Sequence, residues 1–295
     1  AAAWRAGASW FILPVWRAVG PRRARIPPRR GGIDVPARSG GAASPAGPRR
    51  RTVLAGAAAL VLLAACHPAP VMQTRTRFLM DTYCTIQAYG TTRTARALDA
   101  ALDRAENLER KFSAHLAGSP VQRFNATGEP ITDPEVVDLV AKALSVSRAT
   151  DGAFDPTVYP LLAAWGFYGD APARPAPERL AAARSRVGWR QVRVARGRVT
   201  RDAPGVCLDL GGIAKGYAAD AAAAVLREHG VDSALIDFGG NLAVLGDKGG
   251  RDWFIGVRHP RRAGDLIYAF GIRDAAVATS GDYERFFEAG ERRYH

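Results

Sequence analysis

Cysteine is scarce in this chain, with three residues among 295. None of them belongs to a CxxC pair or has a histidine at metal-ligand spacing, so no zinc site is indicated. Cys66 closes the apolar leader described below, which leaves Cys84 and Cys207 for the folded part. An oxidising compartment would permit a disulfide between these two, but two small buried thiols are the interpretation we favour.

Several catalytic motifs are missing as well. The five histidines form no HExxH motif and no pair spaced four residues apart, and no GxSxG segment occurs. The glycine-rich segment 211–216 fits neither the GxGxxG fingerprint of dinucleotide-binding proteins nor the GxxxxGK[ST] phosphate loop. Residues 239–248 also miss the phosphate-loop spacing. Generic motifs therefore leave the function open.

The positive charge is confined to one end of the chain. The formal net charge is +13, but residues 1–66 hold 11 arginines against a single acidic residue, Asp34. The other 30 basic and 27 acidic residues nearly cancel over residues 67–295. A nucleic-acid-binding protein would carry its basic surface on the folded part, so we expect no nucleic-acid partner.

The first 66 residues divide into two parts. Residues 1–48 are rich in Arg, Pro, Gly and Ala and show no sustained apolar period, so we expect either a disordered leader or upstream sequence included by a misplaced start. Residues 49–66 combine three arginines with an apolar run of 14 residues, which is shorter than the roughly 20 residues that span a bilayer. This combination predicts a secretory signal peptide.

The signal peptide ends in Leu63-Ala64-Ala65-Cys66, which is similar to a bacterial lipobox. In a lipobox the cysteine becomes the lipidated N-terminus, whereas the alternative is a buried cysteine in an ordinary apolar helix. The arginines before the apolar run and the proline-containing residues 67–70 after it favour the lipobox. We therefore expect an exported lipoprotein, anchored in a membrane through Cys66 and facing the periplasm, with residues 67–74 as a linker.

Residues 75–295 begin with one expected strand and several expected helices. Residues 75–89 are rich in β-branched and aromatic side chains and predict a strand. Residues 93–111 place apolar side chains at 3.6-residue spacing and predict a helix. A second helix opens at the N-cap candidate Asp133 and at Pro134, and Gly152 lets the chain leave it.

The second half of the domain adds strands. A short helix after the proline-rich residues 171–177 leads to a hairpin of residues 191–194 and 198–201. A strand at residues 206–210, a Gly211-Gly212 turn and a helix over residues 215–229 follow, and His229 should cap that helix. Further strands are expected from residue 233 onward. Mixed strands and helices without steady alternation predict an α+β fold in a single domain.

The Gly211-Gly212 turn is the one generic feature that suits a ligand. Free backbone N–H groups and the helix dipole would face a phosphate placed there. Taken alone, a plain tight turn is the default interpretation of such a segment.

Five segments, in the same order, resemble the sequence blocks of the ApbE family. They are residues 78–83, 111–125, 152–167, 209–220 and 239–241, and residues 278–285 and 293–295 extend the match. The resemblance covers the chain from residue 72 to the end. One block could arise by chance, whereas five in register are highly specific. The α+β domain is therefore expected to be ApbE-like.

Members of this family bind FAD with Mg²⁺ and transfer its FMN half to a Thr or Ser of an acceptor protein, releasing AMP. The resemblance thus implies a flavinyltransferase whose partner is an acceptor flavoprotein. It also implies which residues form the site. FAD contacts are expected from Met80, His115, Ala153, Phe154, Asp155, Asp209 and Lys215, and a metal-binding oxygen from Gly212.

Lys215 and Asp209 are expected to carry the catalysis. Cleavage of a pyrophosphate requires neutralising the charge that builds on its oxygens, which Mg²⁺ and Lys215 can do. Asp209 could hold the metal, a water of its shell, or a hydroxyl of FAD. Without the resemblance, an N-capping Asp209 and a solvated Lys215 would be the simpler interpretation. We expect Trp165 to be buried in the core.

The chain departs from the family in two places. His115 stands where the family has an aromatic residue against the flavin ring, and imidazole offers less stacking area. The chain also stops at His295, where the family continues with a His-Ile-Asp-Pro-like block and with an Asp and a Thr of the metal site. The remaining metal ligands are therefore expected beyond residue 295. Two other functions stay open: a non-catalytic FAD-binding lipoprotein, and an FAD pyrophosphatase that yields FMN and AMP.

Overall fold

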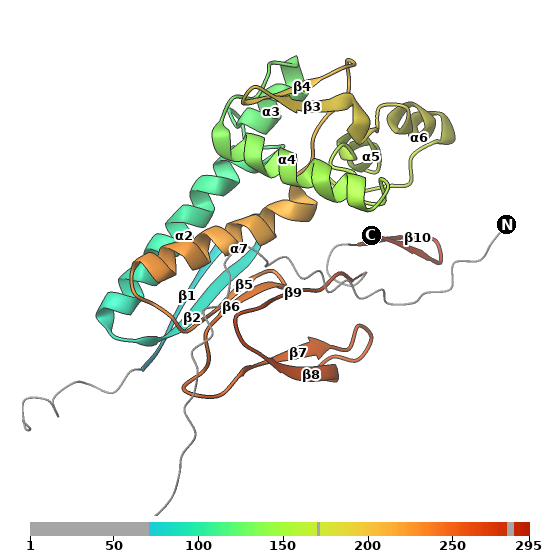
Figure 1. The fold of residues 1–295 in the computed structure, drawn as a ribbon. Helices are drawn as coiled ribbons and strands as arrows, with labels where there is room; N and C mark the ends of the chain where they lie inside the picture. Colours follow the sequence, from blue (N-terminus) through green and yellow to red (C-terminus); the bar gives the residue numbers. More distant parts are fainter. Residues whose placement is uncertain (1–70, 170–171, 282–285) are drawn as a thin grey trace, which may run out of the picture. The chain divides into compact units, whose positions relative to one another are not determined.

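The structure, a computed structural model, describes residues 71–169, 172–281 and 286–295, all within one compact unit of residues 69–295. Its main sheet has five antiparallel strands in the order β1-β2-β5-β6-β9 (Figure 1). These strands are Val71–Leu79, Thr82–Gly90, Ala234–Phe238, Asn241–Leu245 and Ala276–Ala278. β1 begins at Val71, inside the segment 67–74 that was predicted to be a linker.

Two long helices, α2 (Thr92–Phe112) and α7 (Gly211–Glu228), pack against each other and against the sheet (Figure 1). The buried face of α2 repeats with the helical period that its sequence predicts. It consists of Ala95, Ala97, Leu98, Ala101, Leu102, Ala105, Leu108 and Phe112. The buried face of α7 is almost entirely alanine, so α7 can approach its neighbours closely.

The segment between α2 and α7 contains shorter elements. They are α3 (Pro120–Thr127), α4 (Pro134–Ala149), α5 (Tyr159–Ala164), α6 (Pro177–Arg184), the 3₁₀ helix η1 (Trp189–Gln191), β3 (Val192–Ala195) and β4 (Arg198–Arg201). The predicted N-cap of α4 is confirmed, because Asp133 Oδ1 accepts from the N–H groups of Glu135 and Val136 at 3.0 and 3.2 Å. The predicted β3–β4 hairpin is confirmed as well.

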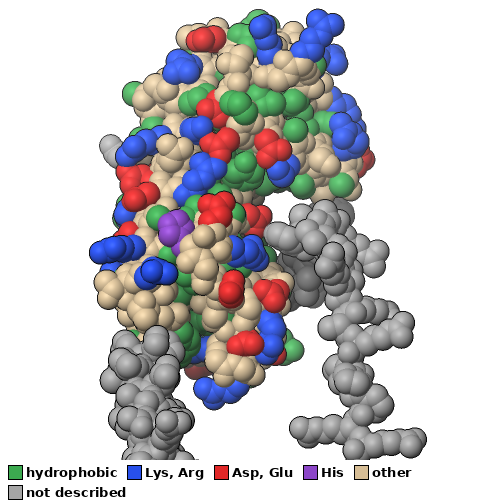
Figure 2. Space-filling view, turned by 60° about the vertical axis from the view of Figure 1, so that its left-hand side comes forward, with side chains coloured by type: hydrophobic (Ala, Val, Ile, Leu, Met, Phe, Trp, Pro, Cys, Tyr) green, Lys and Arg blue, Asp and Glu red, His purple; other side chains and the backbone are tan. Residues whose placement is uncertain are grey.

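Two further hairpins complete the described chain. They are β7 (Trp253–Arg258) with β8 (Leu266–Ile272), and β10 (Phe287–Ala289) with β11 (Arg292–Tyr294). The α+β prediction is confirmed by this combination of antiparallel sheets and packed helices. Within the described ranges, no helix combines the length and the apolar character needed to cross a membrane. Acidic and basic side chains are mixed over the face drawn in Figure 2, in keeping with the nearly balanced charge counts after residue 66.

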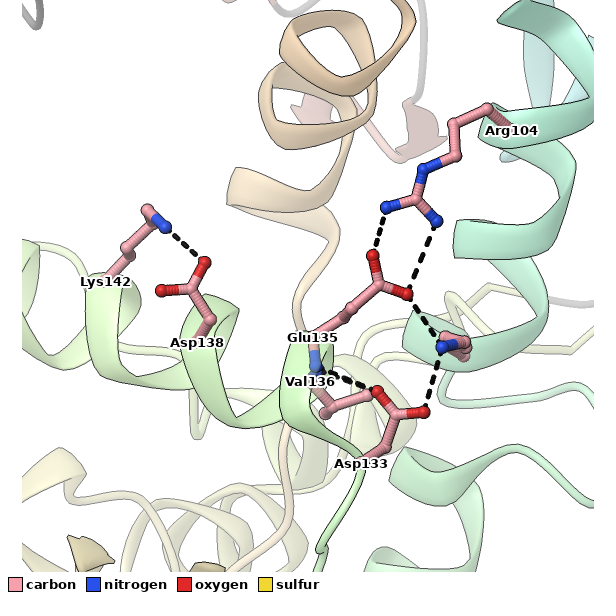
Figure 3. Close-up of polar contacts among 7 residues, drawn as sticks. Arg104, Asp133, Glu135, Val136, Asp138 and Lys142 are labelled. Carbon is pink, nitrogen blue, oxygen red and sulfur yellow. Dashed lines mark hydrogen bonds and ion pairs between the residues drawn. The ribbon is translucent and has the colours of Figure 1, made fainter. Parts of the chain in front are cut away.

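A cluster of charged side chains joins the start of α4 to α2 (Figure 3). The Glu135 carboxylate accepts from both terminal nitrogens of Arg104 and lies 2.7 Å from Lys111 Nζ. Lys111 Nζ also lies 3.0 Å from Asp133 Oδ2. The hydrogen bonds from Arg104 are the largest cause that lowers the pKa of Glu135 to about 2, and Lys111 acts in the same direction. The acidic side chains at the start of α4 are therefore neutralised by basic side chains of α2.

The prediction of a single strand over residues 75–89 is wrong, because the chain reverses at Met80 and Asp81. Leu79 pairs with Thr82 across a two-residue turn, and the φ angles of Met80 and Asp81 are 53° and 58°. Two positive φ angles are what a tight hairpin of this twist requires, and such turns usually carry Gly or Asn. The sequence contains neither residue at this turn, so the reversal could not be predicted.

The predicted strand at residues 206–210 is wrong too. The Asn125 side chain pairs with the backbone of Leu208 in both directions, with Nδ2 to the carbonyl at 2.8 Å and the N–H to Oδ1 at 2.7 Å. A side-chain amide thus takes the place of a neighbouring strand. The expected Gly211-Gly212 turn is also corrected, since both glycines already belong to α7.

Cys84 is buried, Cys207 is half-buried, and both are free thiols, so the structure contains no disulfide between them. The predicted C-cap of α7 is confirmed by a 2.8 Å contact between His229 Nδ1 and the Val225 carbonyl. The leader of residues 1–48, the signal peptide of residues 49–66 and the lipobox Cys66 lie outside the described residues.

Candidate active site

The N-terminus of α7 is open. Gly211 and Gly212 are exposed, the first turn contains no acidic residue, and the N-cap residue Leu210 makes no side-chain hydrogen bond to the helix. Within the described part of the chain, the Gly212 N–H has no hydrogen-bond partner. A helix end with free N–H groups carries partial positive charge and favours an anion.

Asp209 lies directly before this open end and is fixed by three hydrogen bonds. Its N–H donates to the Pro156 carbonyl at 2.8 Å, and its Oδ1 accepts from the Gly211 N–H at 2.8 Å. Its Oδ2 accepts from the hydroxyl of Tyr168. Asp209 therefore satisfies the first N–H of α7, as a capping residue would, and also ties the helix to two other segments.

The loop after α4 brings Phe154 to the same place. A Cβ added to Gly212 would lie 3.0 Å from Phe154 Cε2, so the ring packs against the helix at a point where only glycine leaves room. The neighbouring Asp155 organises this loop, because its carboxylate accepts from Thr157 at 2.8 and 2.6 Å and from the Trp189 N–H at 3.1 Å. Ala153 lies exposed on the loop.

Three rings lie together beside Asp209. The exposed ring of His115 has its centroid 4.2 Å from that of Tyr168, and Tyr168 stacks on Tyr159 at 4.8 Å. Burial raises the pKa of Tyr159 above its usual value, and the nearby carboxylate of Asp209 adds to this rise. The imidazole of His115 is thus backed by two larger rings close to the start of α7.

The tip of the β1–β2 hairpin forms the other side of the site. The Met80 N–H donates to Glu109 Oε1 at 2.7 Å, which holds the tight turn against α2. The pKa of Cys84 is raised to about 12, mainly by burial; the carboxylates of Glu109 and Asp237 contribute to this rise, and the ammonium of Lys215 opposes it. Lys215 therefore lies close enough to this end of the hairpin for its charge to act on the Cys84 thiol.

Lys215 differs from the other lysines of the chain. Lys111 and Lys142 form ion pairs, and the Lys248 ammonium lies 5.3 Å from the Trp253 ring centroid. Half-buried Lys215 has no ion pair or hydrogen bond within the ranges that the structure describes. Because Gly212 and Lys215 are three residues apart on one helix, both lie on the same face of α7.

The predicted site residues thus gather around the first turn of α7 in two groups. His115, Phe154, Asp209 and Gly212 are linked through Tyr168 and through the close approach of Phe154 to the helix. Met80 and Lys215 lie toward the hairpin tip. The individual contacts to FAD, including those of Ala153 and Asp155, stay predictions.

Three residues that hold this site were not predicted from the sequence: Glu109, Asn125 and Tyr168. Glu109 is a charged residue of α2 of the kind that ordinarily faces solvent, and Tyr168 belongs to no recurrent motif. Asn125 lies inside the second block of the resemblance, which was the one available signal. Their partners are 29 to 83 residues away in the sequence, so spacing alone could not reveal them.

The described residues do not make a complete metal site on their own. In the ranges 71–169, 172–281 and 286–295, no group of three or more His, Cys, Asp or Glu side chains could hold an ion. Near the open helix end, Asp209 and a backbone oxygen of Gly212 are the available oxygen donors, and the Asp209 carboxylate already accepts two hydrogen bonds. The metal-binding role of Gly212 stays a prediction.

A cavity of about 520 Å³ lies outside this group of residues. It is lined by Trp165, Arg174, Pro175, Pro177, Leu180, Arg292 and Tyr294. The prediction that Trp165 is buried in the core is wrong, because its half-buried ring lines the cavity, with its centroid 5.0 Å from that of Tyr294. None of the predicted site residues lines the cavity.

The fold and the site define an α+β protein whose helix α7 begins with a free backbone N–H, beside a lysine that has no ion pair within the described residues. Residues 80–295 match the sequence profile of the ApbE family. The chain therefore belongs to the ApbE family, and the resemblance seen in its sequence blocks is confirmed.

Curated relatives and solved structures agree with this assignment. The chain is 34% identical over 246 residues to the FAD:protein FMN transferase of Treponema pallidum, covering 75% of this chain and 67% of the relative. It is 31% identical over 257 residues to the enzyme of that name from Vibrio cholerae, covering 83% and 76%.

Among solved structures, the ApbE protein of Thermotoga maritima matches with a TM-score of 0.72 and 34% identity, covering 76% of this chain and 75% of that one. The flavin transferase ApbE of Vibrio cholerae matches with a TM-score of 0.66 and 26% identity, covering 76% and 75%. The predicted single ApbE-like domain is thereby confirmed.

Proposed function

We propose that this protein transfers FMN from FAD to a Thr or Ser hydroxyl of an acceptor protein and releases AMP. The names of its relatives support flavin transfer. The observation that carries the proposal to this chain is half-buried Lys215, without an ion pair in the described ranges, on the same helix face as the free Gly212 N–H. Together these groups present positive charge where a pyrophosphate would lie.

The reaction exchanges the phosphoanhydride bond of FAD for a phosphodiester bond to the acceptor protein. The acceptor oxygen forms a bond to the phosphorus on the FMN side, the bridging P–O bond of the pyrophosphate breaks, and AMP leaves with the electron pair. The hydroxyl proton passes to AMP or to solvent. Negative charge grows on the leaving phosphate, so the Lys215 ammonium and the N-terminus of α7 would stabilise the transition state.

The other half of FAD would be held by the aromatic side of the site. His115, backed by the ring of Tyr168, would lie against the flavin, with Met80 at the tip of the β1–β2 hairpin. A bound Mg²⁺ would neutralise further negative charge on the pyrophosphate. The residues described here supply at most part of its ligands.

The test is to co-express the protein with an acceptor protein in cells that supply FAD and Mg²⁺. The acceptor is then purified and analysed by mass spectrometry. The proposal predicts an FMN adduct on Thr or Ser and one AMP released for each adduct. Free FMN and AMP without an adduct would instead identify a pyrophosphatase. Bound but uncleaved FAD would identify a carrier.

We also propose that the protein is an exported lipoprotein attached to a membrane through Cys66 and facing the periplasm. The support is the arginine-flanked apolar run that ends at this cysteine. Cys66→Ala should move the protein from the membrane fraction to the soluble fraction or leave it unprocessed. An Ala variant of unchanged size that stays bound to the membrane would contradict this proposal.

A further inference from the structure

Tyr168 touches both halves of the candidate site. Its ring centroid lies 4.2 Å from that of His115, on the predicted flavin side. Its hydroxyl donates to Oδ2 of Asp209, on the side of the open helix end. One side chain thus joins two site residues that lie 94 positions apart in the sequence, from 115 to 209.

The ring of Tyr168 has a clear role beside His115. An imidazole is smaller than a phenyl ring, and its orientation is weakly fixed when it is exposed on a loop. Tyr168 tilts by 50° against His115 and is itself stacked on Tyr159 with an interplanar angle of 25°. The ring of Tyr168, held by its stacking on Tyr159, thus limits the orientations open to the imidazole.

The hydroxyl of Tyr168 has a separate role. Asp209 Oδ1 accepts from the Gly211 N–H, and Asp209 Oδ2 accepts from Tyr168 alone among the described side chains. Without the Tyr168 hydroxyl, only one oxygen of the carboxylate would be held, and the group could rotate. A hydrogen bond to a carboxylate is stronger than one between neutral groups, so it fixes the orientation of Asp209 effectively.

We propose that Tyr168 is a positioning residue for the transfer reaction, which rests on the function proposed above. Its ring orients His115 and its hydroxyl orients Asp209, so that one side chain sets the flavin end and the phosphate end of FAD relative to each other. Removing the hydroxyl should therefore impair a different step from removing the ring.

Two variants separate these roles in the full chain. Tyr168→Phe keeps the ring, so its dissociation constant for FAD should stay within about twofold of the wild type, whereas kcat for FMN transfer should fall about tenfold. Tyr168→Leu should show the same loss of kcat, a dissociation constant for FAD about fivefold higher, and a shifted visible absorption spectrum of the bound flavin.

Tyr268 provides the matched controls. It lies on β8, is 61% exposed, and pairs with the ring of Phe270 at 5.5 Å, outside the candidate site. Tyr268→Phe and Tyr268→Leu make the same chemical changes, and both should leave the FAD affinity, kcat and the flavin spectrum unchanged. Melting temperatures of all four variants show whether any loss of activity reflects loss of folded protein.

The expected split between Tyr168→Phe and Tyr168→Leu would support the inference. It is overturned if both variants match the wild type, or if their losses vanish after correction for the folded fraction. If the wild-type protein forms an FMN adduct while the Tyr168 variants behave normally, only this inference fails. If the wild-type protein neither binds FAD nor forms an adduct, the proposed function and this inference fail together.

Discussion

The helices α4 and α7 begin in opposite ways. At the start of α4, Asp133 accepts from two backbone N–H groups, and Glu135 adds negative charge in the first turn. At the start of α7, two exposed glycines leave the Gly212 N–H without a partner within the described ranges. The first helix end is complete within the protein, whereas the second can still bind an anion.

The lysines beside these helices follow the same contrast. Lys111 lies within 3.0 Å of both acidic residues at the start of α4, Asp133 and Glu135. Lys215 is also half-buried, but it has no acidic partner in the part of the chain that the structure describes. The two lysines thus differ in their partners among the described residues: Lys111 is neutralised by two carboxylates, and Lys215 pairs with none.

Loss of the unpaired lysine should have the largest effect. Lys215→Ala is expected to lower the rate of FMN transfer by about 100-fold or more, because a cation in a phosphoryl-transfer site stabilises the transition state. Stability should change little, since Lys215 has no ion pair with any residue that the structure describes. Transfer rates beside melting curves provide the measurement, with Lys142→Ala as the control. A Lys215→Ala protein that melts earlier but transfers normally would show that Lys215 is only a helix-surface residue.

Asp209→Asn should have the next largest effect. The neutral amide keeps the shape of the side chain but removes a negative charge that a bound cation would need, so about tenfold more Mg²⁺ should be required for half-maximal transfer. The two variants should therefore respond differently to the metal. Titration of the transfer rate with Mg²⁺ tests this, and identical metal dependence in the wild type and the variant would refute it.

Glu135→Gln should lower the stability of the protein at the start of α4 without changing the candidate active site. It leaves Arg104 and Lys111 with one carboxylate fewer, and we expect a loss of about 1–3 kcal/mol in the free energy of unfolding at pH 7. Transfer by the folded protein should stay normal. Urea denaturation measures the first quantity and initial rates the second. A loss of transfer at full folding would place Glu135 in the catalytic machinery instead.

The same variant has a predictable pH dependence. The pKa of Glu135 is lowered from 4.5 to about 2, so its contribution to stability is complete above pH 4.5 and is lost as the pH falls through 2. The difference in stability between wild type and Glu135→Gln should therefore shrink as the pH falls from 4.5 toward 2. A difference that stays constant over this range would show that Glu135 does not act through its charge.

Asp138→Asn should have the smallest effect. Asp138 pairs with Lys142 one turn along α4, but both side chains are about half exposed, so the pair should be worth less than about 0.5 kcal/mol. Figure 3 shows this pair beside the Glu135 cluster. Urea denaturation under the conditions used for Glu135→Gln measures it. An equal loss in both variants would mean that burial does not distinguish the two ion pairs.

Local patterns predicted the elements that depend on local chemistry. The apolar period of α2, the Asp133 cap of α4, the β3–β4 hairpin and the His229 cap follow from neighbouring residues, and all are confirmed. The reversal at Met80 was missed, because a turn with positive φ at Met carries no glycine or asparagine signal. The strand predicted at residues 206–210 failed because Asn125, far away in the sequence, takes up its hydrogen bonds.

The candidate site divides in the same manner. Lys215, Asp209 and Gly212 could be found because they lie in one contiguous block, and the resemblance placed His115 and Phe154. Tyr168 and Glu109 could not be found, because each acts through a partner that only folding brings near. Whether Lys215 has a partner is likewise a property of the folded chain.

The central claim is that the open end of α7 and Lys215 bind the pyrophosphate of FAD. Isothermal titration calorimetry of FAD with the wild type, Lys215→Ala and Lys142→Ala in one buffer tests it most directly. The account predicts that Lys215→Ala binds FAD about tenfold more weakly, because the charge-assisted contact between the lysine ammonium and the pyrophosphate is lost. Lys142→Ala should bind like the wild type. A Lys215→Ala protein that is fully folded and binds FAD with unchanged affinity would contradict the claim.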